Sequence, residues 1–307
     1  MDIHPVVVGI DVCKARLDIF DGRASACANT AEAIGPLAAR WAETGVHVVF
    51  EATGGCDRTL RRALGEAGVA YTRVNPGRAR DFARAAGYLA KTDQVDARML
   101  ARLGQALAPR TDTPVDPARE KLAALHGRRD QLVHARQQER TRLHGVDDPE
   151  VREGVEAHLA WLDGAITALD RRLRETVRAS AALAKAERLL RSVPGIGPVA
   201  AVTLLALVPE LGRIGGKAVA ALVGLAPINR DSGLHRGRRT IGGGRKRPRD
   251  ALYMAALSAT RSHSRFAGRY DHLLAAGKPP KLALVALARQ ILVTANAVLR
   301  DEKAFQR

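Results

Sequence analysis

Cysteine is scarce in this sequence. The 307 residues include three cysteines, Cys13, Cys27 and Cys56, and none belongs to a C-x-x-C pair. This spacing argues against a disulfide framework and against a cysteine zinc site. We therefore expect reduced, buried thiols in a cytoplasmic protein.

Aromatic residues and long apolar runs are also few. Aromatic side chains make up 4% of the chain, which argues against a surface that stacks single-stranded bases. We expect no run long enough to span a membrane, and no basic segment precedes the first apolar run in "MDIHPVVVGID". Neither a membrane segment nor a signal peptide is therefore expected. A nucleotide-binding Walker loop is missing as well, because Ala218 follows the "GGK" at 215–217.

Acidic residues are few relative to basic ones. The chain has 49 lysines and arginines against 32 acids, a formal net charge of +17 and a pI near 10.7. Residues 191–307 hold 20 of the basic residues and only 6 of the acids. A G+C-rich genome also raises arginine content, but it would not concentrate the excess of basic residues in one part of the chain. The asymmetry therefore indicates a polyanionic partner such as nucleic acid.

The N-terminal part alternates between strand and helix patterns. "VVVGID" and "RLDIFD" predict a hairpin within residues 6–21, and "VHVVFEATGG" at 46–55 predicts a buried strand that ends in a glycine-rich turn. Further strands are expected at 24–30 and 69–75, and helices at 31–43, 57–67, 77–87 and 93–107. This alternation is typical of a mixed α/β sheet.

The remainder of the chain predicts helices. A proline-rich break at 108–117 precedes leucines at helical spacing up to residue 190, which indicates two long antiparallel helices. This hairpin could be a plain spacer or an oligomerisation arm. The basic C-terminal part has helical patterns near 217–224, 249–261 and 280–300. We therefore expect three domains, 1–112, 113–190 and 191–307.

Four acids stand in unusual places. Asp93 and Asp96, in "KTDQVDARMLARL", lie on one face at the start of a helix, where both could serve simply as capping residues. Asp11 and Glu51, however, lie within or at the end of apolar strands, where an isolated carboxylate would be desolvated. Clustered carboxylates repel one another unless cations bind between them. Such oxygen ligands suit two Mg²⁺ or Mn²⁺ ions and phosphoryl transfer.

These motifs resemble a known family. "GID", "FEATG" and "KTDQVDA" resemble the DEDD, RuvC-like domain of insertion-sequence transposases, and "VPGIGPVAA", "LVGLAPINRDSG" and "GGRKRPRDALYMAAL" resemble their second domain. These are the RNA-guided bridge recombinases, which are related to the Piv-type invertases. The resemblance covers about two-thirds of the chain. It implies an α/β RNase H-like N-terminal domain, an α-helical coiled-coil hairpin and a mainly α C-terminal transposase domain.

The resemblance also assigns roles to residues. It implies that Asp11, Glu51, Asp93 and Asp96 bind the metal ions, and that Ser232 in "RDSGLHRGRR" is the nucleophile that joins DNA. From the residues alone, Ser232 could equally be a loop serine in a phosphate-binding turn, and its activating base is not evident.

Several residues are expected to contact nucleic acid. The "PGIGPVAA" segment resembles a helix-hairpin-helix turn, whose glycines admit a phosphate, although a tight turn into a core helix explains it equally well. The expected nucleic-acid-binding residues are Gly195, Gly197, Arg230, His235, Arg236, Arg238, Arg239, Arg245, Lys246, Arg247 and Arg249.

The expected function is site-specific recombination that moves an insertion sequence. The partners that the resemblance implies are donor and target double-stranded DNA, a structured guide RNA, and further copies of the chain in a dimer or tetramer. Two other functions remain open. One is a RuvC-type junction nuclease that needs no serine, and the other is a basic DNA-binding protein without enzymatic activity.

Overall fold

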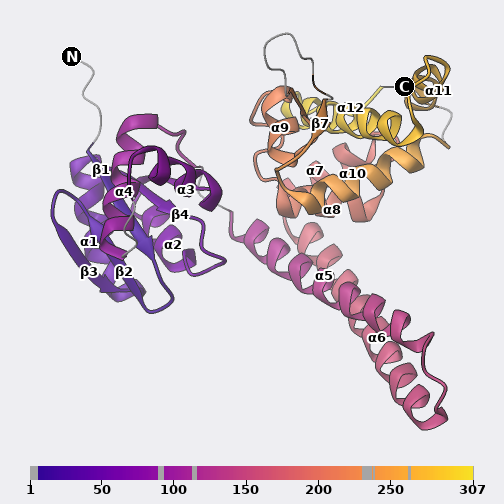
Figure 1. Cartoon of the computed structure of the whole chain (residues 1–307), viewed down its shortest axis with the longest axis horizontal. Coiled ribbons are helices and arrows are strands. Elements are labelled where there is room, and N and C mark those ends of the chain that lie inside the picture. Colours follow the sequence, from indigo (N-terminus) through magenta and orange to yellow (C-terminus); the bar gives the residue numbers. More distant parts are fainter. Residues whose placement is uncertain are drawn as a thin grey trace. The chain divides into compact units, whose positions relative to one another are not determined.

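The computed structural model of the chain describes residues 6–88, 93–112, 116–229, 237, 239–261 and 264–306. It divides into two compact units, Met1–Pro114 and Val115–Arg307 (Figure 1). The regions expected as separate domains, 113–190 and 191–307, fall almost entirely within the second unit.

The first unit is built on a five-stranded mixed sheet, which confirms the expected α/β architecture. Its strands follow the order β3-β2-β1-β4-β5, with antiparallel pairing among the first three and parallel pairing from β1 through β4 to β5. The strands are β1 (Val7–Val12), β2 (Arg16–Phe20), β3 (Ala24–Ala28), β4 (His47–Glu51) and β5 (Ala70–Val74).

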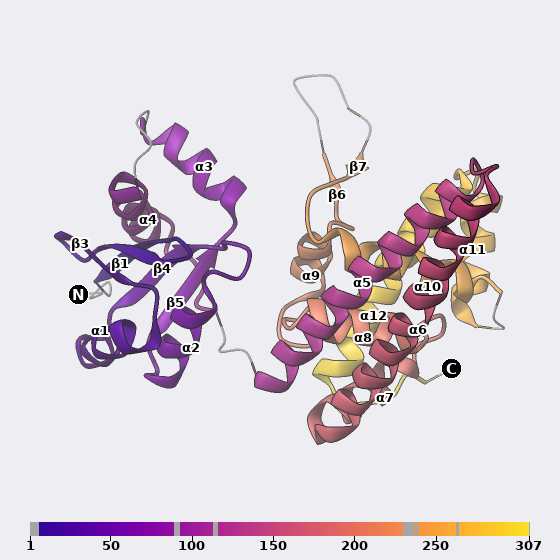
Figure 2. The ribbon, with the colours of Figure 1, turned by 90° about the horizontal axis from the view of Figure 1, so that it is seen from below.

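Helices cover both faces of this sheet, as Figure 2 shows. Side chains alternate along β1, so Val8 and Ile10 pack on one face with α1 and α2, while Val7 packs on the other with α4. The helices are α1 (Ala31–Thr44), α2 (Arg58–Glu66), α3 (Pro76–Ala85) and α4 (Asp93–Leu107).

Two glycines bring α4 unusually close to the sheet. A β-carbon added to Gly9 of β1 would overlap the carbonyl oxygen of Ala97 and the amide nitrogen of Ala101. A β-carbon on Gly104 of α4 would similarly overlap Val7 and Val49 of the strands. Only hydrogen at these positions allows the helix backbone to lie against β1. The glycine of the "GID" motif thus determines how closely α4 approaches Asp11.

We expect Gly9→Ala to destabilise the first unit by about 1–3 kcal/mol, because the added methyl group meets backbone atoms that cannot rotate away. Thermal unfolding measures this effect. Gly35→Ala in α1 is the matched control, since a β-carbon there has no neighbour within 4 Å and alanine favours a helix. A Gly9→Ala melting temperature equal to that of Gly35→Ala would contradict this account of the packing.

The second unit begins with two long antiparallel helices, α5 (Pro117–Leu143) and α6 (Pro149–Ala179) (Figure 1). Leu132, Leu162 and Ile166 form an apolar core between them. The other elements are α7 (Ala181–Arg191), α8 (Pro198–Leu207), α9 (Gly216–Val223), β6 (Pro227–Ile228), β7 (Thr240–Ile241), α10 (Lys246–Ala259), α11 (Arg265–Ala275) and α12 (Pro280–Arg300).

The last helix corrects one expectation. α12 is 21 residues long and apolar enough to cross a membrane by length and composition alone, so the prediction that no run reaches that length is wrong. Its buried side chains, among them Leu287, Ile291 and Ala295, belong to the main core of the second unit. A helix enclosed in a core is apolar on several sides, which explains its composition.

Candidate functional site

Asp11 and Glu51 lie side by side on neighbouring strands. The parallel register pairs Gly9 with Val49 and Ile10 with Phe50, so the next pair along is Asp11 with Glu51. Val49 packs on the face of the sheet that α4 covers. Because strand side chains alternate, Asp11 and Glu51 share that face with Val49.

Asp93 and Asp96 occupy the first turn of α4, which packs across β1. The helix dipole favours carboxylates in that turn, so the capping interpretation is compatible with a second role. Both aspartates also act on Asp11. Burial first, and then the negative charges of Asp96 and Asp93, raise the pKa of Asp11 from 3.8 to about 6. The acids from β1 and α4 are therefore close enough to repel one another.

Cys13 joins this group, although it was not among the expected site residues. One ligand atom each from Asp11, Cys13 and Asp93 lie within 4.8 Å of one another, and Cys13 Sγ is 4.0 Å from Asp11 Oδ2. Cys13 is exposed, and Cys27 and Cys56 are partly buried, so the expectation of buried thiols is wrong. Cys13 directly follows the end of β1, and strand alternation continued by one residue places it on the same side as Asp11, two residues earlier. That alternation is the signal that could have placed it there.

This donor set fits a divalent cation. Carboxylate oxygens on β1 and α4 face one region, and their mutual repulsion is the electrostatic condition that a cation relieves; the register places Glu51 of β4 next to Asp11. Asp11, Glu51 and Asp96 are half-buried, whereas Asp93 is exposed. The site is thus open on the side of the first turn of α4.

The raised pKa of Asp11 predicts a pH dependence. Its folded pKa of about 6 exceeds the ordinary value of 3.8, so the folded protein holds this proton more tightly than the unfolded chain does. Without metal, stability should therefore fall as pH rises from about 4 to 7. We expect Asp11→Asn to remove most of this loss and to melt a few degrees above wild type at pH 7.5 but not at pH 4. Equal pH profiles for the two proteins, measured in EDTA, would refute this.

Ser232 lies outside the described residues, as do Arg230, His235, Arg236 and Arg238. The structure describes the flanks of this segment. β6 and β7 pair there in antiparallel register, with Pro227 opposite Ile241 and Ile228 opposite Thr240. Arg239, next to β7, is exposed.

The basic run at 245–249 makes intramolecular contacts. Arg245 donates to both carboxylate oxygens of Glu210 at 2.6 Å, and Arg249 Nη1 donates to the Gly243 carbonyl at 2.6 Å. Lys246 pairs with Asp250. The role of these residues in binding nucleic acid stays a prediction, and each now has a partner within the protein.

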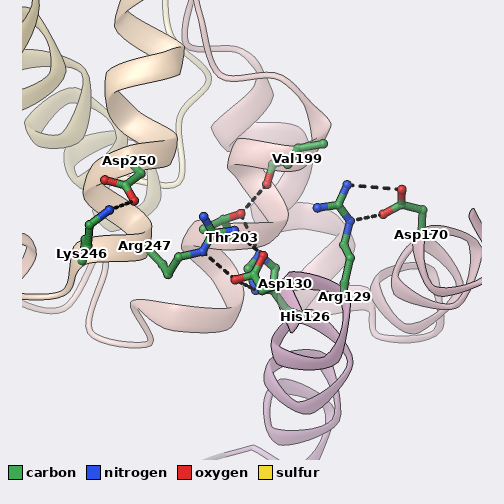
Figure 3. A network of polar contacts seen from close by, with 9 residues as sticks. All are labelled: His126, Arg129, Asp130, Asp170, Val199, Thr203, Lys246, Arg247 and Asp250. Atoms are coloured by element: carbon green, nitrogen blue, oxygen red, sulfur yellow. Dashed lines mark hydrogen bonds and ion pairs between the residues drawn. The ribbon is translucent and has the colours of Figure 1, made fainter. Parts of the chain in front are cut away.

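Arg247 belongs to a larger network between three helices (Figure 3). Its guanidinium pairs with Asp130 of α5. Asp130 Oδ2 lies 3.5 Å from Nδ1 of His126, whose Nε2 is 2.8 Å from Thr203 Oγ1 in α8. His126 is buried, and its desolvation lowers its pKa. This network connects α10 to α5 of the long helical hairpin.

The two glycines of "PGIGPVAA" differ in their surroundings. Gly195 has φ +90°, and a β-carbon on it would overlap the carbonyl oxygen of Ala255 in α10, so the residue is required by packing. Gly197 is the N-cap of α8 and is exposed, with no atom within 4 Å of an added β-carbon. Of the two, Gly197 has the space to admit a phosphate.

Comparisons with known proteins agree with this layout. Residues 8–146 match the family DEDD_Tnp_IS110, described as a transposase, and residues 187–271 match the Transposase IS116/IS110/IS902 family. The pilin gene-inverting proteins of Moraxella lacunata and Moraxella bovis are each 28% identical, over 85% of this chain and 82% of their own length. The uncharacterized 44.8 kDa protein of insertion element IS116 from Streptomyces clavuligerus is 34% identical over 48% of the chain and 36% of its own.

The two matched regions cover the acids of the first unit and the serine and basic motifs of the second. Taken together they extend over most of the chain. The protein therefore belongs to the IS110/IS116 family of transposases, with homologues among the Piv-type pilin gene-inverting proteins.

Proposed function

We propose that this transposase breaks and joins DNA strands at the acidic face of its first unit, with Asp11, Glu51, Asp93 and Asp96 holding two divalent cations, Mg²⁺ or Mn²⁺. The proposal is supported by the nearness of Asp11 on β1 to the two aspartates in the first turn of α4, and by the register, which puts Glu51 of β4 next to Asp11. Bound cations would neutralise the charge that develops on the attacked phosphate and the displaced oxygen.

Ser232 is the proposed nucleophile. Its Oγ forms a bond to a DNA phosphorus, and the bond from that phosphorus to a deoxyribose oxygen breaks. A base takes the proton from the serine hydroxyl and passes it to the deoxyribose oxygen that leaves. A deoxyribose hydroxyl of the second DNA strand then reverses the step and frees Ser232. The phosphodiester energy is conserved in the covalent link, which agrees with the absence of a Walker loop in the sequence.

The choice of DNA sites is proposed to come from a structured RNA encoded by the element, in a dimer or tetramer of this chain. The sequence resemblance to bridge recombinases supports the guide RNA, and the names of the Moraxella relatives support recombination at defined sites. Base pairing can supply specificity while the protein binds backbone and shape. A discrete RNA should copurify with the protein, and altering its loops should change the site. Correct site choice by RNA-free protein would refute this part.

The direct test of the proposed function combines protein, copurified RNA, donor and target DNA, and Mg²⁺. We expect recombined DNA together with a DNA–protein adduct that protease mapping assigns to Ser232. Hydrolysed DNA without an adduct would instead indicate a RuvC-type nuclease. DNA binding without any strand breakage would indicate a non-enzymatic role.

The arginines of the second unit should divide into two classes. Arg239 is exposed beside the serine segment, so Arg239→Gln should reduce the slope of log affinity for DNA against log salt by about one. Arg245 is bound to Glu210 and to the Leu207 carbonyl, so Arg245→Gln should leave that slope unchanged and lower the melting temperature. Binding titrations at several salt concentrations measure this difference, and the reverse assignment would contradict it.

A further inference from the structure

A fifth carboxylate lies next to Asp11. Asp18 of β2 is directly opposite Asp11 in the antiparallel register and is only 2% exposed. Directly opposite residues project from the same face of a sheet, so Asp18 also faces α4. The negative charge of Asp18 contributes to the raised pKa of Asp11. A buried carboxylate in this position repels the carboxylate of Asp11, so it requires a positively charged group to compensate its charge.

Arg16 supplies that cation. Its Nε donates to Asp18 Oδ2 at 3.1 Å, and its Nη2 donates to Asp18 Oδ1 at 2.8 Å. This two-bond geometry fixes the plane of the guanidinium. The side chain of Arg16 nevertheless remains 58% exposed, whereas that of Asp18 is 3% exposed. A guanidinium has five N–H donors, and these two bonds leave three for another acceptor.

The guanidinium of Arg16 is close to the acid site. Its hydrogen bond to Asp18 raises its pKa, and the negative charges of Asp18 and of Asp93 on α4 raise it further. Arg16 and Asp18 are two residues apart on β2, so both lie on the face that carries Asp11. Arg16 is thus an exposed cation of fixed orientation next to carboxylates, and it can bind an anion that those carboxylates would repel.

We propose that Arg16, oriented by the buried Asp18, binds a non-bridging oxygen of the DNA phosphate that reacts at the acid site. Arg16 is then a phosphate-binding residue of the reaction, and Asp18 is a positioning residue. The proposal rests on the proposed function, because it takes the acidic face as the place where DNA reacts. A planar guanidinium with free donors is well suited to a phosphate that the neighbouring carboxylates would otherwise repel.

The competing explanation is that Arg16 only neutralises Asp18. Arg16→Gln alone cannot separate the two, because it leaves a buried carboxylate without its partner and destabilises the protein. The double variant Arg16→Gln/Asp18→Asn removes both charges and avoids that penalty. Arg40→Gln is the matched control, since Arg40 has the same side-chain exposure of 58% and pairs with Asp21 elsewhere in the unit.

The experiment measures single-turnover strand transfer, Mn²⁺ binding and thermal unfolding in the full-length protein with its RNA. We expect the double variant to fold and to bind Mn²⁺ within about threefold of wild type, but to transfer strands about 100-fold more slowly. Arg16→Lys, which keeps the charge but lacks the planar fork, should recover only part of the rate. Arg40→Gln should match wild type throughout.

Two results would overturn the proposal. If the double variant transfers strands within threefold of wild type, or loses Mn²⁺ binding in proportion to its rate, Arg16 does not act on the phosphate, and the proposed function still stands. If wild type transfers no strand with Mg²⁺, or Asp11→Asn is as active as wild type, the proposed function fails and the role of Arg16 fails with it.

Discussion

Asp11→Asn should abolish Mg²⁺-dependent strand transfer, with a loss of about 10³-fold or more. Asparagine has nearly the same shape as aspartate, but it lacks the negative charge with which a carboxylate holds a divalent ion tightly. Asp11 is next to Glu51 in the strand register and close to Asp93 and Asp96. Removing its carboxylate charge therefore removes the central ligand of the proposed metal site. The measurement is the single-turnover rate at saturating DNA, together with Mn²⁺ affinity.

The fold of this variant provides an internal check. Removing one of several mutually repelling carboxylates should leave the metal-free protein folded and somewhat more stable at neutral pH. Asp21→Asn is the matched control, because Asp21 is partly exposed, is paired with Arg40 and is not among the acids that act on Asp11. If Asp11→Asn retained full strand transfer, the carboxylates would not form the reactive site.

Ser232→Ala should eliminate the DNA–protein adduct and reduce recombination by roughly 10⁴-fold or more, because no other atom of the side chain can form the covalent link. DNA binding and Mn²⁺ binding should remain within about threefold of wild type, since alanine removes one hydroxyl group. Gel analysis under denaturing conditions detects the adduct, and sequencing of the product detects recombination.

The same variant distinguishes the proposed function from a junction nuclease. A nuclease that uses the four acids and water would retain hydrolysis in Ser232→Ala and lose it in Asp11→Asn. Ser258→Ala, at an exposed serine of α10, is the control for a general effect of losing a hydroxyl group in this unit. Recombination at the wild-type rate by Ser232→Ala would require a different nucleophile.

The sequence was sufficient to predict the mixed sheet and the strands and helix that carry the four acids. The apolar runs around Asp11 and Glu51 indicate neighbouring central strands, and the pattern around Asp96 indicates an amphipathic helix. Alternation in strands and the parallel arrangement then bring these residues to one edge. These predictions depend on short-range periodicity, which a single sequence displays.

Other features depend on contacts between distant segments, which periodicity does not encode. The need for glycine at position 9 becomes visible only when α4 lies against β1. The buried Asp18 looks in the sequence like an ordinary polar strand residue. The run from Arg245 to Arg249 looks like a free basic patch, because its acceptors Glu210 and Asp130 are far away in sequence.

The measurement that tests the central claim most directly is anomalous X-ray diffraction from crystals of the protein soaked in Mn²⁺. We predict a manganese peak about 2.0–2.3 Å from carboxylate oxygens of Asp11 and of at least one of Glu51, Asp93 and Asp96, absent from Asp11→Asn crystals treated identically. A fully occupied manganese ion elsewhere, with no peak between β1, β4 and the first turn of α4, would contradict the account.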